Sequence, residues 1–236
     1  MSLPPPVANQ AFCDVSALEA GHIKIPLAWV LDDVSDSEFI SAPTLSFLVR
    51  HRTRNDGTLV FDLGLRKDRE TLPPAIIKQA AAGKSTASVP LDVVDSLAKG
   101  GTMPSDVEHQ FFVGEGSRAL VADRYPTNPD SVIPADVVPE DRTTYLDPQG
   151  WRPLGPFLHA LDFHGDGSVY AVNAGHGHMP GHLNLLVRTS GDGGWIYLAG
   201  DSAHHWDLLN GGGGIGRHPL FGCAHEDPDA AEAHIE

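Results

Sequence analysis

Residues 175–182 read GHGHMPGH, and residues 200–205 read GDSAHH. Each segment directly follows an apolar run that predicts a β-strand, so both sets of polar side chains are expected at strand ends. Proteins commonly place binding groups on loops that a rigid scaffold positions in this way. A neutral imidazole can bind a divalent metal with little proton cost, and an aspartate can bridge two metals. The two segments therefore predict a metal site built on a sheet.

The sequence around these loops alternates between strand and turn patterns. A meander of four strands is expected from residue 158 to residue 199, with glycine-rich turns between some of its strands. Upstream, a turn that contains Asp56-Gly57 separates two apolar runs and predicts a hairpin. The predicted strands are residues 23–29, 45–50, 58–63, 110–113, 158–163, 168–172, 183–188 and 195–199.

Helical patterns lie between the two groups of strands. One helix is expected to open at Pro73-Pro74, and a second covers residues 91–99, with acids in its first turn and a glycine pair after it. Residues 122–157 are rich in proline and aspartate and are interpreted as a long surface loop. The proline-rich residues 1–20 are expected to form an extended arm. Strands, then helices, then strands again predict layered α/β sheets.

Length, charge and hydropathy indicate which kinds of partner and location to expect for this protein. The 236 residues can bury a sizeable core, and the net charge of −15 argues against nucleic acid as a partner. No apolar run approaches the roughly 18–20 residues needed to span a bilayer, and the first residues lack a signal-peptide pattern. We therefore expect a cytoplasmic protein without a membrane partner. Ten of the 13 histidines lie at or after His159, which points to metal or proton chemistry in that part of the chain.

Three motifs resemble those of the metallo-β-lactamase superfamily. Residues 177–182 are similar to its Gly-His-x-Pro-Gly-His motif, Gly200-Asp201 to its bridging aspartate, and residues 61–64 (FDLG) to the end of its opening hairpin. Three motifs in the right order are more specific than any one of them. Residues 125–129 (YPTNP) and 200–205 further resemble lactonase-like hydrolases, particularly fungal ones.

The resemblance implies a fold, a metal and an activity. Over residues 21–236 it implies an incomplete αβ/βα four-layer sandwich, in which two mixed sheets carry helices outside. It implies zinc as the cofactor, with His178 as a ligand of one ion and Asp201 between two. The implied substrate is a small-molecule lactone or ester, and fungal relatives often belong to secondary metabolism.

The family's His-x-His-x-Asp-His motif is absent from this sequence. It is expected after residues 91–99, where residues 104–114 read PSDVEHQFFVG and match only the flanks. The family's last histidine is expected beyond Glu236. A catalytic zinc usually has three protein ligands, so the two family ligands here predict weak metal binding. The missing segment is also expected to remove a strand and disturb the first sheet.

Other histidines near the two loops are candidate substitute ligands, or groups that act from behind the ligands. They are His176, His182, His204 and His205.

Three hypotheses remain open. The first is a metal-dependent hydrolase that acts on a lactone or ester with an incomplete metal site. The second is a catalytically inactive relative, either a pseudoenzyme or a mis-spliced product, that acts as a binding protein or has no function. The third is a cupin built on His176 and His178. That pattern needs a glutamate a few residues later, where this sequence has Gly181 and His182.

Overall fold

The computed structural model describes residues 2–82, 85–107 and 109–236 of the chain. Its strands are β1 (Cys13–Pro26), β2 (Phe39–His51), β3 (Thr58–Phe61), β4 (Thr86–Ser88), β5 (Phe111–Gly114), β6 (Thr143–Leu146), β7 (Arg152–Leu154), β8 (Phe157–Asp162), β9 (Val169–Asn173), β10 (Leu183–Arg188) and β11 (Trp195–Leu198). Its α-helices are α1 (Pro74–Ala81), α2 (Val93–Lys99), α3 (Arg118–Ala122), α4 (Trp206–Asn210) and α5 (Pro228–Ile235).

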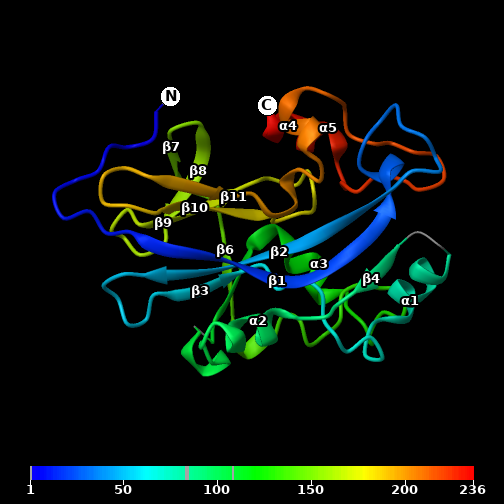
Figure 1. Ribbon diagram of the computed structural model, residues 1–236, viewed down its shortest axis with the longest axis horizontal. Coiled ribbons are helices and arrows are strands. Elements are labelled where there is room, and N and C mark those ends of the chain that lie inside the picture. Colours follow the sequence, from blue (N-terminus) through cyan, green and yellow to red (C-terminus); the bar gives the residue numbers. More distant parts are fainter. Residues whose placement is uncertain (1, 83–84, 108) are drawn as a thin grey trace.

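Two sheets form the centre of the molecule and lie one above the other in Figure 1. The first has the strand order β3-β2-β1-β4, and the second has the order β11-β10-β9-β8-β7. Strands β5 and β6 form a separate parallel pair. The predicted α/β layered fold is confirmed, and so is the meander, to which β7 adds a fifth strand. This architecture excludes the cupin hypothesis.

An apolar core fills the space between the two sheets. Val49 of β2 and Val187 of β10 are fully buried there, together with Cys13, Val169 and Leu198. Successive side chains of a strand point to opposite faces, so Leu186 lies on the outer face of the second sheet. It packs there with Val172 and Ala160, against Leu3 from the N-terminal segment.

Helix α2 covers the outer face of the first sheet. Val93 and Leu97 are buried against Leu18, Ala20 and Leu48 of β1 and β2. The helix begins at Val93, two residues after the predicted start, because Asp92 caps it. The Asp92 carboxylate accepts a hydrogen bond from the Asp95 backbone N–H at 2.9 Å, which satisfies an otherwise free donor of the first turn.

Two expectations about irregular segments need correction. Strand β1 begins at Cys13, which pairs with His51, so residues 13–20 of the predicted arm belong to the first sheet. Residues 122–157 were predicted to be a loop, and this is wrong for β6 and β7, which pair with β5 and β8. These strands depend on their partners more than on an alternating pattern of their own, so periodicity could not reveal them.

The end of one predicted strand also differs. The predicted strand 23–29 ends at Pro26, where the 3-10 helix η1 (Leu27–Trp29) follows. Strand β5 pairs with β6 and lies outside the first sheet, and the expected removal of a strand from that sheet stays a prediction. Among the described residues, no helix combines the length and apolarity that a bilayer span requires.

We expect Leu186→Ala to lower the free energy of unfolding by about 2–5 kcal/mol, because the side chain is only 2% exposed and its removal leaves a cavity. Leu158→Ala is the matched control, since Leu158 of β8 is 69% exposed and its loss should change stability by less than about 0.5 kcal/mol. Urea unfolding followed by circular dichroism measures both. Equal losses in the two variants would contradict this assignment of the core.

Candidate metal centre

The two histidine-bearing loops meet at one end of the second sheet. Strand β10 pairs antiparallel with both β9 and β11, so that Leu183 lies opposite Asn173 and Leu185 lies opposite Leu198. The end of β9, the start of β10 and the end of β11 therefore share one edge. The loop 174–182 and the segment after β11 leave the sheet side by side at this edge.

Three imidazoles come together there. His178, His204 and His225 each offer a ring nitrogen, and these atoms lie within 4.8 Å of one another. His204 Nδ1 and His225 Nε2 are 3.1 Å apart. The ring centroid of His178 is 5.1 Å from that of His204 and 5.6 Å from that of His225. We call these three residues the histidine cluster.

Asp201 lies on the open side of the histidine cluster. One carboxylate oxygen is 3.5 Å from His178 Nε2, and the other is 3.6 Å from His204 Nε2. These separations are long for hydrogen bonds. They are close to the spacing of two ligands on one tetrahedral zinc ion, about 3.3 Å when the bonds are about 2.0 Å long. The Asp201 side chain is 55% exposed, so a small molecule can reach it from solvent.

The hydrogen bonds of these rings also suit metal ligands. Within the described part of the chain, the buried Nδ1 atoms of His178 and His225 have no hydrogen-bond partner. His51 provides the contrast, because its Nε2 bonds to Asp166 at 2.9 Å and its Nδ1 accepts from two backbone N–H groups. An imidazole that serves only the fold is satisfied in this way. His178 and His225 each keep one buried ring nitrogen open in this sense, whereas His204 and His225 are bonded to each other.

Burial favours the neutral form of His182, His204 and His225. Desolvation, and then the neighbouring His204, lower the pKa of His225 to about 4. Desolvation, and then His178, lower the pKa of His182 to about 4 as well. Burial also lowers the pKa of His204, and the attraction of Asp201 opposes this only in part. Because a metal binds neutral imidazole, these groups need not release protons at neutral pH.

His225 reaches the cluster through the start of α5. The Glu226 backbone N–H donates to the carbonyl of His178 at 3.0 Å, and that of Asp227 donates to the carbonyl of Gly177 at 2.9 Å. A Cβ atom on Gly177 would lie 2.6 Å from Ala231 Cα, so only glycine allows this close approach of loop and helix.

The opposite side of the same loop is held equally closely. Gly181 has a φ of +79°, which favours glycine, and a Cβ there would lie 2.5 Å from the backbone nitrogen of Ser117 and 2.8 Å from the carbonyl oxygen of Gly114. Gly114 ends β5, and Ser117 belongs to the 3-10 helix η3 (Glu115–Ser117). The loop that carries His178 is therefore packed between α5 and the segment after β5.

The structure separates the predicted site residues into two groups. His178, Asp201 and His204 come together, and His182 lies behind His178 with their ring centroids 5.3 Å apart. Two predicted substitutes lie elsewhere. His176 is exposed and pairs with Asp227 at 3.1 Å, whereas His205 accepts a hydrogen bond from the Asp207 N–H as the N-cap of α4.

His225 is the functional candidate that the sequence analysis missed. The sequence predicts the last family histidine beyond Glu236 and only two family ligands, whereas the folded chain supplies a third imidazole from residue 225. The only sequence signal was the excess of late histidines. His225 stands in an irregular segment, and its position depends on the contacts of α5 and not on a local pattern.

Asp62, which follows β3, extends the site toward the first sheet. Its φ is +63°, and its carboxylate accepts a hydrogen bond from the Gly64 N–H at 2.8 Å. Although Asp62 is exposed at the surface, desolvation and the negative charge of Asp201 raise its pKa against the opposing hydrogen bond from the Gly64 N–H.

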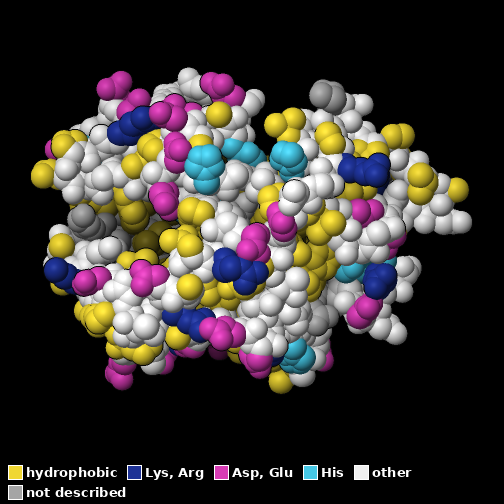
Figure 2. All heavy atoms as spheres, turned by 180° about the vertical axis from the view of Figure 1, so that it is seen from behind, with side chains coloured by type: hydrophobic (Ala, Val, Ile, Leu, Met, Phe, Trp, Pro, Cys, Tyr) yellow, Lys and Arg dark blue, Asp and Glu magenta, His cyan; other side chains and the backbone are white. Residues whose placement is uncertain are grey.

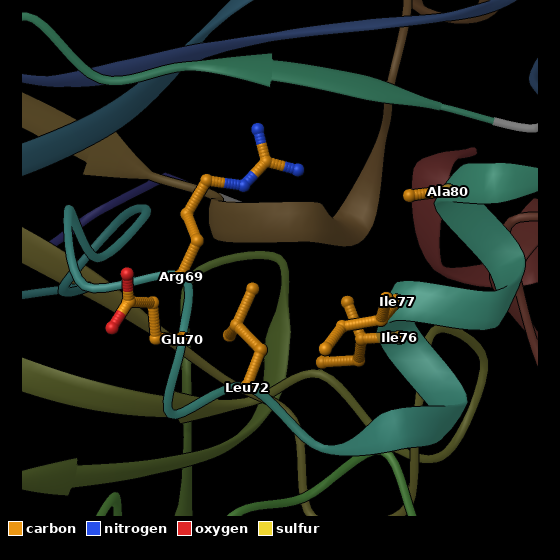
Figure 3. Close-up of a pocket in the computed structure, with 6 residues that line it drawn as sticks. All are labelled: Arg69, Glu70, Leu72, Ile76, Ile77 and Ala80. Carbon is orange, nitrogen blue, oxygen red and sulfur yellow. The ribbon is translucent and has the colours of Figure 1, made fainter.

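The candidate metal centre does not coincide with the hollow beside α1. Figure 2 shows histidine side chains at the surface of one face, with acidic and hydrophobic groups around them. In Figure 3, Leu72, Ile76 and Ile77 line a hollow of about 230 Å³ beside α1, and the Glu70 carboxylate points away from them. None of its lining residues belongs to the histidine cluster, so this hollow is not the candidate metal centre.

Several curated proteins are similar to the chain, although no protein-family model matches it. A gamma-lactamase of Gibberella moniliformis is 32% identical over 171 residues, which cover 62% of this chain and 71% of the relative. A gamma-lactamase of Fusarium pseudograminearum is 30% identical over 238 residues, which cover 86% and 57%. A cytochrome P450 monooxygenase of Penicillium roqueforti is 30% identical, and the match covers 87% of this chain but 28% of that protein. The chain thus spans only part of these longer relatives.

Solved structures share the fold. An N-acyl homoserine lactone hydrolase with its product at the catalytic metal centre superimposes with a TM-score of 0.64 at 13% identity, covering 100% of this chain and 87% of the other. The AiiA protein of B. thuringiensis with N-decanoyl-L-homoserine bound gives a TM-score of 0.68 at 13% identity, with the same coverage. At this level of identity the likeness concerns the fold.

We expect the metal-free protein to lose stability as the pH falls from about 6.5 toward 4. The pKa values of His182 and His225 are about 4 in the folded chain and return to about 6.5 on unfolding. Between these values the unfolded state binds more protons, so the stabilisation is complete above about pH 6.5 and declines below it. Urea unfolding of chelator-treated protein between about pH 7 and pH 5, where carboxylates titrate little, measures the slope.

The matched variant is His182→Asn, which keeps a polar side chain but cannot take up a proton. Its stability should depend less steeply on pH over the same interval than that of the wild type. A wild-type stability that stays constant across this interval would contradict the lowered pKa values.

Proposed function

Because the chain belongs to the metallo-β-lactamase superfamily, we propose that it is a metal-dependent hydrolase that opens a lactone or ester, with zinc as its metal. The histidine cluster is the observation that carries this proposal. The rings of His178, His204 and His225 make a nitrogen ligand set, and the Asp201 carboxylate lies beside it. Zinc sites in hydrolases use such sets and keep one position open.

The residues that would hold the ion are His178, His204 and His225, with Asp201 at the solvent side. The chemistry that zinc supplies when bound is Lewis acidity, which acidifies water and polarises a carbonyl group. The contribution of the chain is to hold neutral imidazoles on one side and a carboxylate on the other. This arrangement leaves the approach from solvent to Asp201 open.

Asp201 is the group best placed to handle protons. Its carboxylate is more than half exposed, whereas His178 and His204 are mostly buried. A carboxylate within hydrogen-bonding reach of an attacking water can accept its proton and later return it to a leaving group. His182 lies behind His178 and packs on Gly200, where a Cβ would be 3.0 Å from its Nε2. It therefore supports the loop and does not meet the substrate.

The proposed substrate class rests on the relatives. Two similar fungal proteins are named gamma-lactamases, and the structural neighbours act on or bind N-acyl homoserine lactones or their products. A lactam and a lactone each contain a carbonyl group in a ring. Hydrolytic opening of either ring passes through an intermediate in which the carbonyl oxygen becomes an oxyanion. A cation beside Asp201 would stabilise such an oxyanion. We therefore propose a small-molecule lactone or ester, with a lactam as the nearest variant to test.

The alternative is an inactive relative that binds a ligand without turnover. The observation that favours it is the absence of the His-x-His-x-Asp-His motif from the sequence. Without that motif, the described residues form a cluster suited to one ion. Metal content and turnover on the same protein preparation separate the two functions.

We expect His225→Ala to lower zinc affinity by at least about 100-fold. Loss of a residue that only supports a metal ligand costs up to about 100-fold in affinity, and loss of a ligand should cost at least as much. Hydrolysis of a panel of lactones, esters and lactams should fall with it. His176→Ala is the control, because His176 is exposed and lies outside the cluster. Calorimetric titration with zinc and turnover assays measure both effects. Wild-type protein that takes up no metal and shows no turnover in added zinc would refute the proposal.

A further inference from the structure

Asn184 lies directly behind the segment that carries Asp201. It belongs to β10, two residues after His182, and its side chain is completely buried. Its amide contacts three side chains from three other elements. They are Tyr197 of β11, Ser202 of the 3-10 helix η5 (Gly200–Ser202) and His234 of α5.

The donors and acceptors around Asn184 determine which way its amide group is turned. The oxygen accepts from the Tyr197 hydroxyl at 2.6 Å, from Ser202 Oγ at 2.8 Å and from His234 Nε2 at 3.2 Å. The nitrogen then donates to the carbonyl oxygen of Ala199 at 2.7 Å. Asn184 thus bonds to the residue before Gly200-Asp201 and to the residue after it.

This pair of hydrogen bonds matters because η5 is too short to hold its own shape. Gly200 has a φ of +50°, and Asp201 has a non-helical backbone with φ −91° and ψ 23°. The segment has one local backbone bond, from the Ser202 N–H to the Ala199 carbonyl. A turn of this size has no cooperative stability of its own. Its conformation is therefore set by external contacts, and the buried Asn184 supplies two of them.

His234 connects the same amide to the other side of the histidine cluster. It lies in the last turn of α5, and the segment before this helix carries His225 and bonds to the loop of His178. The network from Ser202 through Asn184 to His234 therefore joins Asp201 and His204 to the helix that positions His225. The two halves of the candidate site share one buried amide.

We propose that Asn184 is a positioning residue, which with His234 fixes Asp201 and His204 relative to His178 and His225. This inference rests on the proposed metal-dependent function. Asn184 is too deeply buried to touch the ion or the substrate, so it acts through the residues that it holds. A residue that only stabilised the fold would change the free energy of unfolding and leave the metal geometry unaltered.

Asn184→Ala tests the proposal, with Leu186→Ala as the matched control. Both residues are buried on β10, and two positions apart they face the same side of the sheet. Cobalt serves as the probe because its visible absorption reports the geometry of its ligands. We expect Asn184→Ala to weaken cobalt and zinc affinity by about 10- to 100-fold and to alter the cobalt spectrum. Leu186→Ala should lower stability while the affinity and spectrum stay those of the wild type.

A second pair of variants covers the case in which Asn184→Ala does not fold. His234→Ala removes the donor on α5 and should weaken cobalt affinity in the same direction, whereas His234→Gln keeps an N–H group and should restore it. The positioning proposal would be overturned if folded Asn184→Ala or His234→Ala protein kept the wild-type cobalt affinity and spectrum. The proposed metal-dependent function would stand in that case. Wild-type protein that binds neither cobalt nor zinc would overturn the proposed function and this inference together.

Discussion

The antiparallel pairing of β10 with β9 on one side and β11 on the other is the constraint on which the candidate site depends. It sets Leu183 opposite Asn173 and Leu185 opposite Leu198, so three strand ends coincide at one edge. Because the side-chain period of a strand is two, a slip of one residue would exchange the faces of Leu186 and Val187. The core between the sheets, where Val187 is fully buried, therefore holds the register that brings the loops of His178 and Asp201 together.

The candidate metal centre has uncharged imidazoles on its buried side and a carboxylate on its exposed side. Its inner side includes His204 and His225, whose pKa values are lowered by desolvation, whereas its outer side carries the exposed carboxylate of Asp201. Proteins tolerate buried groups of this kind when the groups stay neutral or meet a partner. A cation placed between the two sides would meet neutral donors from within and negative charge from solvent. The negative charge of Asp201 also acts on Asp62 of the first sheet, where after desolvation it is the next cause that raises the pKa of the carboxyl.

Much of this could be predicted from the sequence, and the misses have a common cause. His178 and Asp201 each follow an apolar strand, so the local pattern located both, and the second sheet followed from alternation along 158–199. His225 has no such pattern, because its place depends on backbone bonds between the start of α5 and the His178 loop. Strands β6 and β7 likewise exist through their partners. Periodicity identifies elements that are regular over several residues, and it cannot identify positions that only tertiary contacts define.

The close packing of the loop around His178 has an entropic consequence. Gly177 touches α5 and Gly181 touches the segment after β5, so the backbone on both sides of His178 has little freedom. A ligand that must be ordered when the metal arrives loses conformational entropy at that moment. Here that loss has already occurred during folding, together with the formation of the core. The loop of His178 is thus preorganised before any ligand arrives.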